Sequence, residues 1–569
     1  MLESCHRGVT TLACGALLML LAGCSTPRQK SQADGGTPGA PQALTNIVED
    51  SSDVDLNNVE AHAHYALGMI YDFDEQPDDA LTELSQAALR DPANEELVLE
   101  LSRRYLQLRQ PEQALELLVR ATAVPGASGA IYARLGRVYS RLGKETEALA
   151  ASETAVKRSP QLLTGYENLF LIHLQKGRIA DALTALNDAA KQPQADAQFL
   201  LDLCDLYVTL ERQAPTERDA CRAGARAALQ RAAVLSPENP HLQLKLADGF
   251  NVLGDTTNAV PIYLQLVDRF VELPALRTDI RSKLTDIYLR NHELNKAQSQ
   301  LEMMVEEDPA NGQAYYLLGN LACEAHKMPE AEDYFKKALL LSDDSEEMYY
   351  DLAGVQIDLD HTKAALQTLA KAKAKFQETF REEFLSGLAC SREKDYTNAV
   401  NHFTSAELLA RASEPRRLDE YFYFQAGAAY ERKGDYSEAE QFFNKALDLS
   451  PESAEVLNYL GYMLADHGMK LDHARELIEK AVRLEPANAA YLDSLGWVLY
   501  KLKKPDAALP QELKAIELSP EPDAILFDHL GDIYAAMKQL DKARESWRKS
   551  LSLEANDEIK KKLGNSGRN

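Results

Sequence analysis

Residues 421–451 read YFYFQAGAAYERKGDYSEAEQFFNKALDLSP. Within this stretch Gly427 is followed twelve positions later by Ala439, and Ala446 lies seven positions further on. Ala439 and Ala446 share one face of a helix, because residues seven apart lie on the same side of it. Gly434 separates this helix from an earlier one, and the final proline cannot continue it. The stretch therefore predicts two helices that are joined by a turn and packed closely through small residues.

The same spacing recurs along the chain with a period of about 34 residues. Fourteen first-helix positions follow from this register: Gly68, Ser102, Gly136, Phe170, Cys204, Ala247, Thr285, Gly319, Ala353, Gly387, Gly427, Gly461, Gly496 and Gly531. In most units an alanine lies twelve positions later, although the unit of Gly461 has one extra residue and the unit of Cys204 has an insertion around 211–220. A single hairpin cannot bury its apolar face alone, so neighbouring units must stack. The sequence therefore predicts an all-α solenoid.

This pattern resembles the tetratricopeptide repeat (TPR), and the resemblance covers residues 58–558, most clearly 61–160 and 420–555. The resemblance implies a right-handed superhelical solenoid of about fourteen helix hairpins. It also implies that the first helices line a concave groove and that the chain binds proteins or peptides. It does not identify the partner.

The N-terminal residues resemble the leader of a bacterial lipoprotein. Arg7 precedes an apolar run over 9–22, which is shorter than the roughly twenty residues of a membrane-spanning helix. The run ends in LAGC at 21–24, which resembles a lipobox and implies acylation of the thiol and the amine of Cys24. Ser25 follows in place of an aspartate retention signal, which implies an outer-membrane anchor facing the periplasm. An ordinary secretory signal or an uncleaved anchor is the alternative.

The predicted organisation has four parts. These are a signal peptide over 1–23, the lipidated cysteine with a tether over 24–57, the repeat array over 58–558 and a short basic tail over 559–569. The tether is rich in Ser, Thr, Pro, Gly, Gln and Asp, a composition typical of a disordered linker.

The net charge of −26 argues against a sequence-independent nucleic-acid partner and against flat docking on an anionic membrane. Acidic helix surfaces that keep a long array soluble are one explanation of this charge. An acidic groove for a basic partner is the other.

No catalytic motif and no phosphate-binding loop is recognised, so we expect neither enzymatic activity nor a cofactor. No metal site is expected either, because the closely spaced histidine pairs, His62 with His64 and His467 with His473, have no third partner at ligand spacing. Cys204 and Cys221 flank the insertion. Two interpretations are open. The two cysteines form a disulfide, or each is a small buried residue with a free thiol.

The resemblance also places partner-binding side chains next to the small residue of each first helix. In the last three units these are Asn458, Tyr462, Asp493, Trp497, Asp528 and Asp532. An indole beside carboxylates and an amide suits an extended peptide with basic or polar groups. Packing of Trp497 between repeats is the alternative. Acids occupy the positions where carboxylate-binding TPRs use Lys, Arg and Asn, so we do not expect a C-terminal carboxylate as the ligand.

The sequence leaves three functions open. The first is a membrane-anchored scaffold or adaptor for periplasmic or envelope proteins, such as a processing protease or a cell-wall enzyme. The second is a structural component of an export or assembly system for exopolysaccharide or pili. The third is an enzyme, for which no separate domain is recognised.

Overall fold

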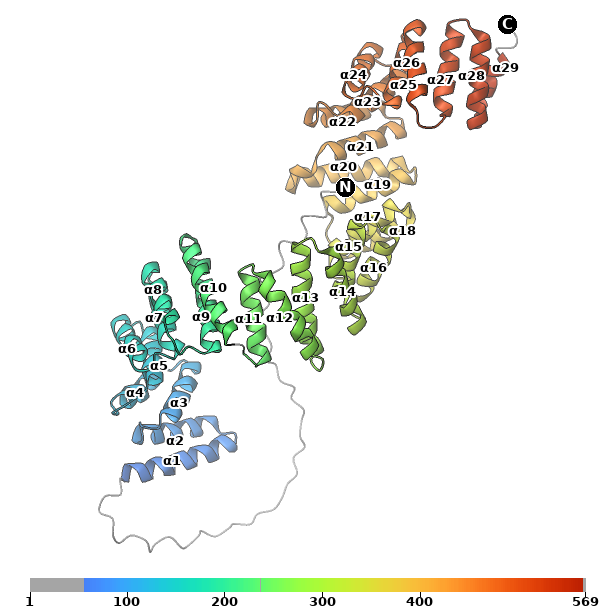
Figure 1. The fold of residues 1–569 in the computed structure, drawn as a ribbon. Helices are drawn as coiled ribbons and strands as arrows, with labels where there is room; N and C mark the ends of the chain where they lie inside the picture. Colours follow the sequence, from blue (N-terminus) through green and yellow to red (C-terminus); the bar gives the residue numbers. More distant parts are fainter. Residues whose placement is uncertain (1–55, 236, 566–569) are drawn as a thin grey trace, which may run out of the picture. The chain divides into compact units, whose positions relative to one another are not determined.

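A computed structural model describes residues 56–235 and 237–565 of the chain. The predicted signal peptide, the lipidation site at Cys24 and nearly all of the predicted tether lie outside the described residues. The regular elements of the described part are all helices (Figure 1). None of these helices combines the length and the apolar content that a membrane span requires.

The described helices belong to two units, an N-terminal unit up to Gln300 and a C-terminal unit from Leu301. The N-terminal unit contains α1 (Leu56–Phe73), α2 (Pro77–Arg90), α3 (Glu95–Gln107), α4 (Pro111–Thr122), α5 (Gly129–Arg141), α6 (Glu145–Arg158), α7 (Leu163–Gln175), α8 (Ile179–Ala190), α9 (Ala197–Gln213), the 3-10 turn η2 (Pro215–Glu217), α10 (Arg218–Val234), α11 (Pro240–Val252), α12 (Thr256–Arg269) and α13 (Pro274–Arg290). The boundary between the units falls within α14 (Leu294–Glu307).

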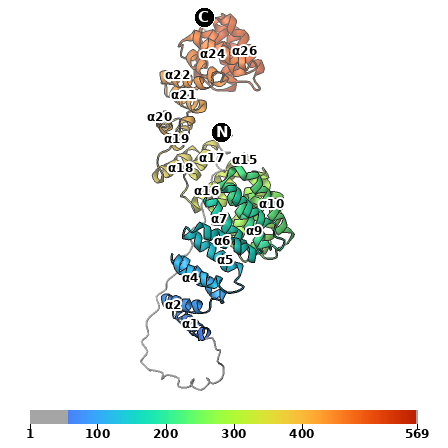
Figure 2. The same cartoon turned by 90° about the vertical axis from the view of Figure 1, so that its left-hand side faces the viewer.

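The C-terminal unit continues with α15 (Gly312–Glu324), α16 (Met328–Leu341), α17 (Glu346–Asp358), α18 (Thr362–Lys375), α19 (Phe380–Arg392), α20 (Tyr396–Ser413), the 3-10 turn η3 (Pro415–Arg417), α21 (Glu420–Lys433), α22 (Tyr436–Leu449), α23 (Ala454–Asp466), α24 (Leu471–Leu484), α25 (Ala489–Lys501), α26 (Pro505–Leu518), α27 (Ala524–Ala536), α28 (Leu540–Leu553) and α29 (Asp557–Asn565). From α1 to α13, and again from α15 to α29, each helix packs against the helices before and after it (Figures 1 and 2).

The predicted register of small residues is confirmed. All fourteen first-helix positions lie in odd-numbered helices from α1 to α27, and each of these helices is followed by a second helix. The alanines of the second helices are fully buried: Ala80, Ala114, Ala148, Ala182, Ala259, Ala297, Ala331, Ala365, Ala399, Ala439, Ala474, Ala508 and Ala543. The all-α solenoid of TPR hairpins is therefore present in each unit, because a side chain no larger than a methyl group lets the two backbones of a hairpin approach.

Each glycine that occupies one of the fourteen first-helix positions is covered by one side chain of its own second helix. A Cβ added to Gly427 would lie 2.8 Å from the ring of Phe443, which is sixteen positions further along the chain. We call the covering residue the glycine-facing position; it lies sixteen residues after the glycine, or seventeen in the unit of Gly461. The residues at this position are Leu84, Ser152, Phe335, Phe403, Phe443, Ile478, Glu512 and Trp547. Glycine is required at these sites because the covering side chain fills the space of a Cβ.

The turn between the two helices is left-handed seven residues after the first-helix position, with or without glycine, in every unit except that of Cys204, whose first helix continues through the insertion. Gly434 has φ of 91°, as its predicted role as a helix stop requires. At the equivalent position of another hairpin, Lys503 has φ of 62°. A left-handed non-glycine residue costs roughly 1–2 kcal/mol, so packing of the two helices must offset that cost.

The two cysteines beside the insertion are free thiols. The insertion lengthens α9 and α10 and forms η2 between them. Cys204 and Cys221 are both buried and unbonded, so the disulfide that the sequence left open is absent from the structure. Each thiol instead fills a small space in the helix core. Burial raises the pKa of Cys204 to about 12 and that of Cys221 to about 11.

The residues predicted as a basic tail form most of α29. This helix packs through Ile559 and Leu563 against Trp547 and Ala543 of α28. It therefore covers the apolar face that the last hairpin would otherwise expose.

Candidate partner-binding surface

The six predicted partner-binding residues lie on three consecutive first helices of the C-terminal unit. They lie on α23, α25 and α27, where α25 contacts both of the other helices (Figure 1). Each of the three helices begins at a side chain that caps it. Ser453, Asn488 and Asp523 accept hydrogen bonds from the backbone N–H groups of the first turn. Such caps satisfy donors that have no partner within the helix, so local sequence determines where each helix starts.

On α23, Asn458 and Tyr462 lie one helical turn apart. The amide oxygen Oδ1 of Asn458 is buried and has no hydrogen-bond partner within the described residues. Tyr462 is half-buried against the core of the C-terminal unit. Burial of its phenol raises the pKa of Tyr462 above the usual value for tyrosine.

On α25, Asp493 and Trp497 are both buried, and the indole is 8% exposed. The ring of Trp497 stacks on that of His529 with 4.0 Å between centroids. Its Nε1 donates to Oδ1 of Asp466 over 3.1 Å, and Nζ of Lys501 lies 4.6 Å from its centroid. These contacts support packing of Trp497 between repeats. Contact of Trp497 and Asp493 with a partner stays a prediction.

On α27, Asp528 and Asp532 are paired with a cation from the C-terminal helix. Nζ of Lys562 lies 2.8 Å from Oδ1 of Asp528 and 2.7 Å from Oδ2 of Asp532. Asp532 also accepts a hydrogen bond from Nε1 of Trp547. Burial raises the pKa of Asp532, although the charge of Lys562 acts in the opposite direction. A partner that binds these two acids must compete with α29.

Similar pairs join neighbouring first helices elsewhere in both units. An acid on one first helix accepts hydrogen bonds from a cation about one repeat later in the sequence, as in Asp72 with Arg104, Asp248 with Lys283, Asp351 with Arg381, and Asp466 with Lys501. The chain therefore neutralises part of its own acidic first-helix surface. Sequence reasoning missed these pairs, although an acid followed by a base roughly 30–36 residues later is a visible signal within the repeat period.

Two polar clusters between neighbouring helices were also not recognised from the sequence. In the first, Nδ1 of His529 lies 2.6 Å from Oδ1 of Asp493, and the fully buried Glu512 completes a group whose ligand atoms all lie within 4.8 Å of one another. The second lies between α19 and α20, where Nδ1 of His402 is 2.7 Å from Oε2 of Glu383.

The second cluster has strongly shifted ionisation. Hydrogen bonds to Cys390 and Glu383 raise the pKa of His402 to about 10. Burial opposes ionisation of Glu383, but His402 and Lys373 together lower its pKa to about 2. The pair is therefore ionised over a wide range of pH and joins the two helices of one hairpin.

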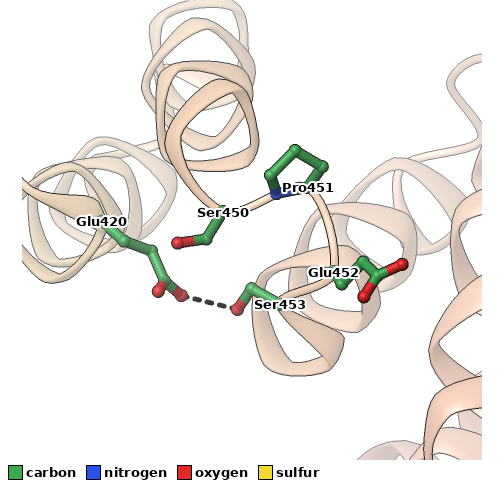
Figure 3. A pocket seen from close by; sticks show the side chains of 5 residues that line it. All are labelled: Glu420, Ser450, Pro451, Glu452 and Ser453. Carbon is green, nitrogen blue, oxygen red and sulfur yellow. Dashed lines mark hydrogen bonds between the residues drawn. The ribbon is translucent and has the colours of Figure 1, made fainter.

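A surface hollow of about 620 Å³ lies close to the start of α23 (Figure 3). It is lined by Glu420 of α21 and by residues 450–453 of the turn before α23, and Oγ of Ser453 donates to Oε1 of Glu420 over 2.5 Å. None of the six predicted residues lines it. The predicted surface is thus a row of first-helix side chains and is distinct from this hollow.

Family models described as tetratricopeptide repeat match five segments of the chain. One model matches 420–453, a second matches 99–162, 283–346 and 470–521, and a third matches 526–557. These segments fall in both units, and each covers all or nearly all of at least one first helix together with its second helix.

A similar curated protein is the photosystem I assembly protein Ycf3 of Acaryochloris marina (strain MBIC 11017), which is 27% identical over 96 residues. The match covers 17% of this chain and 56% of that protein, so the chain spans only about half the length of this relative.

Similar solved structures include the APC/C hetero-tetramer Cut9-Hcn1, at 15% identity and a TM-score of 0.37 over 83% of this chain and 96% of that one. YrrB, described as a TPR protein with an unusual peptide-binding site, is 21% identical with a TM-score of 0.29 over 34% of this chain and 95% of that one. The repeat period, the observed hairpins and the matching family models together show that the chain contains tetratricopeptide repeats.

Proposed function

We propose that the chain is a membrane-anchored adaptor that binds an extended segment of an envelope protein along α23 and its neighbouring first helices. The observation that supports this proposal is the amide oxygen of Asn458, which is buried and has no hydrogen-bond partner among the described residues. A buried acceptor without a partner costs about 1–3 kcal/mol. A backbone N–H group of a bound peptide would satisfy it.

The side chains beyond Asn458 extend the row along the same face of α23. Tyr462 lies one turn further, and Asp466 lies two turns further with its carboxylate 42% exposed. Residues four apart on a helix are neighbours, so an amide, a phenol and a carboxylate follow one another along the row. This order suits a peptide that carries basic or polar side chains.

The anchor and the compartment are part of the proposal. The LAGC sequence at 21–24 supports lipidation of Cys24, and several acyl chains give stable anchoring because each buried methylene contributes about 0.8 kcal/mol. The partner would then be an envelope protein, such as a periplasmic protease or a cell-wall enzyme.

Photocrosslinking in intact cells tests the binding surface. A photoreactive phenylalanine analogue replaces Tyr462 in one variant, and replaces Leu449, an exposed residue at the end of α22, in the control. We expect a crosslinked protein at position 462 that is absent at 449, and we expect Asn458→Ala to reduce its yield. Identical products at both positions, or a yield unaffected by Asn458→Ala, would contradict binding along α23.

Membrane fractionation tests the anchor independently. We expect Cys24→Ser to leave a protein without acyl chains that appears in the soluble fraction. A variant that stays wholly in the membrane fraction would contradict lipid anchoring while leaving the binding surface untouched.

A further inference from the structure

One glycine-facing position contains an ionisable side chain. In six of the eight hairpins with a first-helix glycine this position is apolar, as in Phe443, and in another it is Ser152. The hydroxyl of Ser152 is satisfied, because it donates to the carbonyl of Ala148 over 2.7 Å. Glu512 of α26 instead places a carboxyl group there, with Oε2 at 2.8 Å from where a Cβ of Gly496 would lie.

The carboxyl group of Glu512 has no ordinary means of stabilisation. The residue is 0% exposed, and no donor among the described residues reaches either of its oxygens, so its carboxyl group forms a hydrogen bond with Asp493 only when one of the two groups holds a proton. Burial of an unpaired ionised carboxylate is very costly, so the group needs either a proton or a cation beside it. Packing alone does not explain it, because Leu84 fills the equivalent position above Gly68.

Two further ligand groups lie beside Glu512 on neighbouring helices. Asp493 comes from α25 and His529 from α27, and the ligand atoms of the three residues all lie within 4.8 Å of one another. One imidazole nitrogen and two carboxylate oxygens form a ligand set that zinc accepts, with donor atoms at about 2.0–2.2 Å from the ion. The indole of Trp497, stacked on His529, restricts the orientation of the imidazole.

We propose that Asp493, Glu512 and His529 bind a divalent transition-metal ion, with zinc as the ion that suits them best. The three ligands would leave a fourth coordination position for water, as in zinc sites with three protein ligands. Because α25 and α26 form one hairpin and α27 begins the next, the ion would crosslink two consecutive repeats.

Protonation of the unliganded site agrees with this geometry. Burial, the neighbouring charge of Asp493 and a hydrogen bond with Asp493, with a further contribution from Asp523, raise the pKa of Glu512 to about 10. Without an ion the carboxyl group therefore keeps its proton at neutral pH. A divalent cation would take the place of that proton and would provide the positive charge that the buried carboxylate lacks.

Metal binding to the full chain tests the proposal. The chelator-stripped protein is titrated with zinc by calorimetry, and its melting temperature is measured with and without the ion. Cobalt provides two optical signals, a visible absorption band and quenching of the tryptophan fluorescence, to which Trp497 contributes from beside the site. We expect one equivalent of zinc to bind with micromolar or tighter affinity and to raise the melting temperature by several degrees.

Two variants assign the binding to these residues. Glu512→Leu creates the residue found at position 84 above Gly68, so it should fold, as circular dichroism will show. It should weaken zinc binding at least a hundredfold and abolish cobalt quenching. His64→Asn is the matched control, because Nδ1 of His64 lies 2.6 Å from Oε2 of Glu83 in a pair outside the proposed site. It should bind zinc like the unmodified protein.

Two results would overturn the proposal. Equal zinc binding by Glu512→Leu and the unmodified protein would place the metal elsewhere in the chain. Absence of zinc and cobalt binding to the folded, unmodified protein would show that Glu512 and Asp493 share a proton and form no metal site.

Discussion

Replacement of Gly427 by alanine tests the close approach of the two helices in a hairpin. Alanine is favoured over glycine in a helix interior by about 1 kcal/mol. The new Cβ, however, would lie 2.8, 2.9 and 3.1 Å from three ring atoms of Phe443. That ring is fully buried against Phe424 and Tyr459, so it has little freedom to move. Overpacking costs about 1–3 kcal/mol, so we expect a net destabilisation of about 1 kcal/mol.

Gly354 provides a matched control in another first helix. It lies within α17, and a Cβ added there would meet no atom within 4 Å. Gly354→Ala should therefore show only the gain in helix propensity, a stabilisation of about 1 kcal/mol. The two identical substitutions should differ by about 2 kcal/mol, and the difference measures the space that Phe443 occupies.

Hydrogen exchange measured by mass spectrometry reports these local effects. Repeat arrays do not unfold as one cooperative unit, so the stability of each hairpin must be measured separately. Each substitution changes the amide protection factors of its own hairpin. A difference of about 2 kcal/mol between the two effects on stability corresponds to a roughly thirtyfold difference between the two changes in protection. Equal gains of protection in Gly427→Ala and Gly354→Ala would refute the argument. In a Phe443→Ala background, Gly427→Ala should lose its penalty.

Three further predictions concern other contacts. Ala446→Leu should overpack a fully buried helix junction and lower stability by about 1–3 kcal/mol; an unchanged melting curve would refute the register. The pKa of His402 is raised from 6.5 to about 10, and that of Glu383 is lowered from 4.5 to about 2. Their ion pair should therefore contribute its full stabilisation of the folded protein between about pH 4.5 and 6.5. The stability gap to His402→Gln should shrink as pH rises from 6.5 towards 10, and a constant gap would contradict this pairing. Lys562→Ala should destabilise α29 by about 1 kcal/mol, because Asp532 loses its cation. Faster amide exchange in α28 and α29 would show this, and unchanged exchange would count against the ion pair.

Sequence reasoning predicted the helices because their determinants are local. A small residue at Gly427, an alanine at Ala439 and a stop at Gly434 specify a hairpin within one repeat. Less regular units kept the same register, and the first-helix positions at Phe170, Ala247 and Thr285 all lie in first helices as predicted. The turn at Lys503 has no glycine, and its left-handed backbone follows from packing of the helices on either side.

For the candidate surface, the sequence predicted which helices contain the residues but not the contacts of their side chains. Position in the repeat placed Asn458, Trp497 and Asp532 on neighbouring first helices, which the structure confirms. The repeat pattern did not show that Trp497 is buried among its neighbours or that Lys562 forms an ion pair with the carboxylate of Asp532. Burial and pairing depend on side chains from the next repeat, whose conformations the repeat spacing does not specify.

The sequence by itself determined the class of fold, the number of hairpins and their register, because these follow from small residues at a fixed spacing along one chain. Only the tertiary structure decided that Cys204 and Cys221 stay apart as free thiols and that Glu512 lies beside Asp493 and His529. These outcomes depend on which atoms meet between helices and on how much water remains around them. That information arises only when the hairpins are stacked.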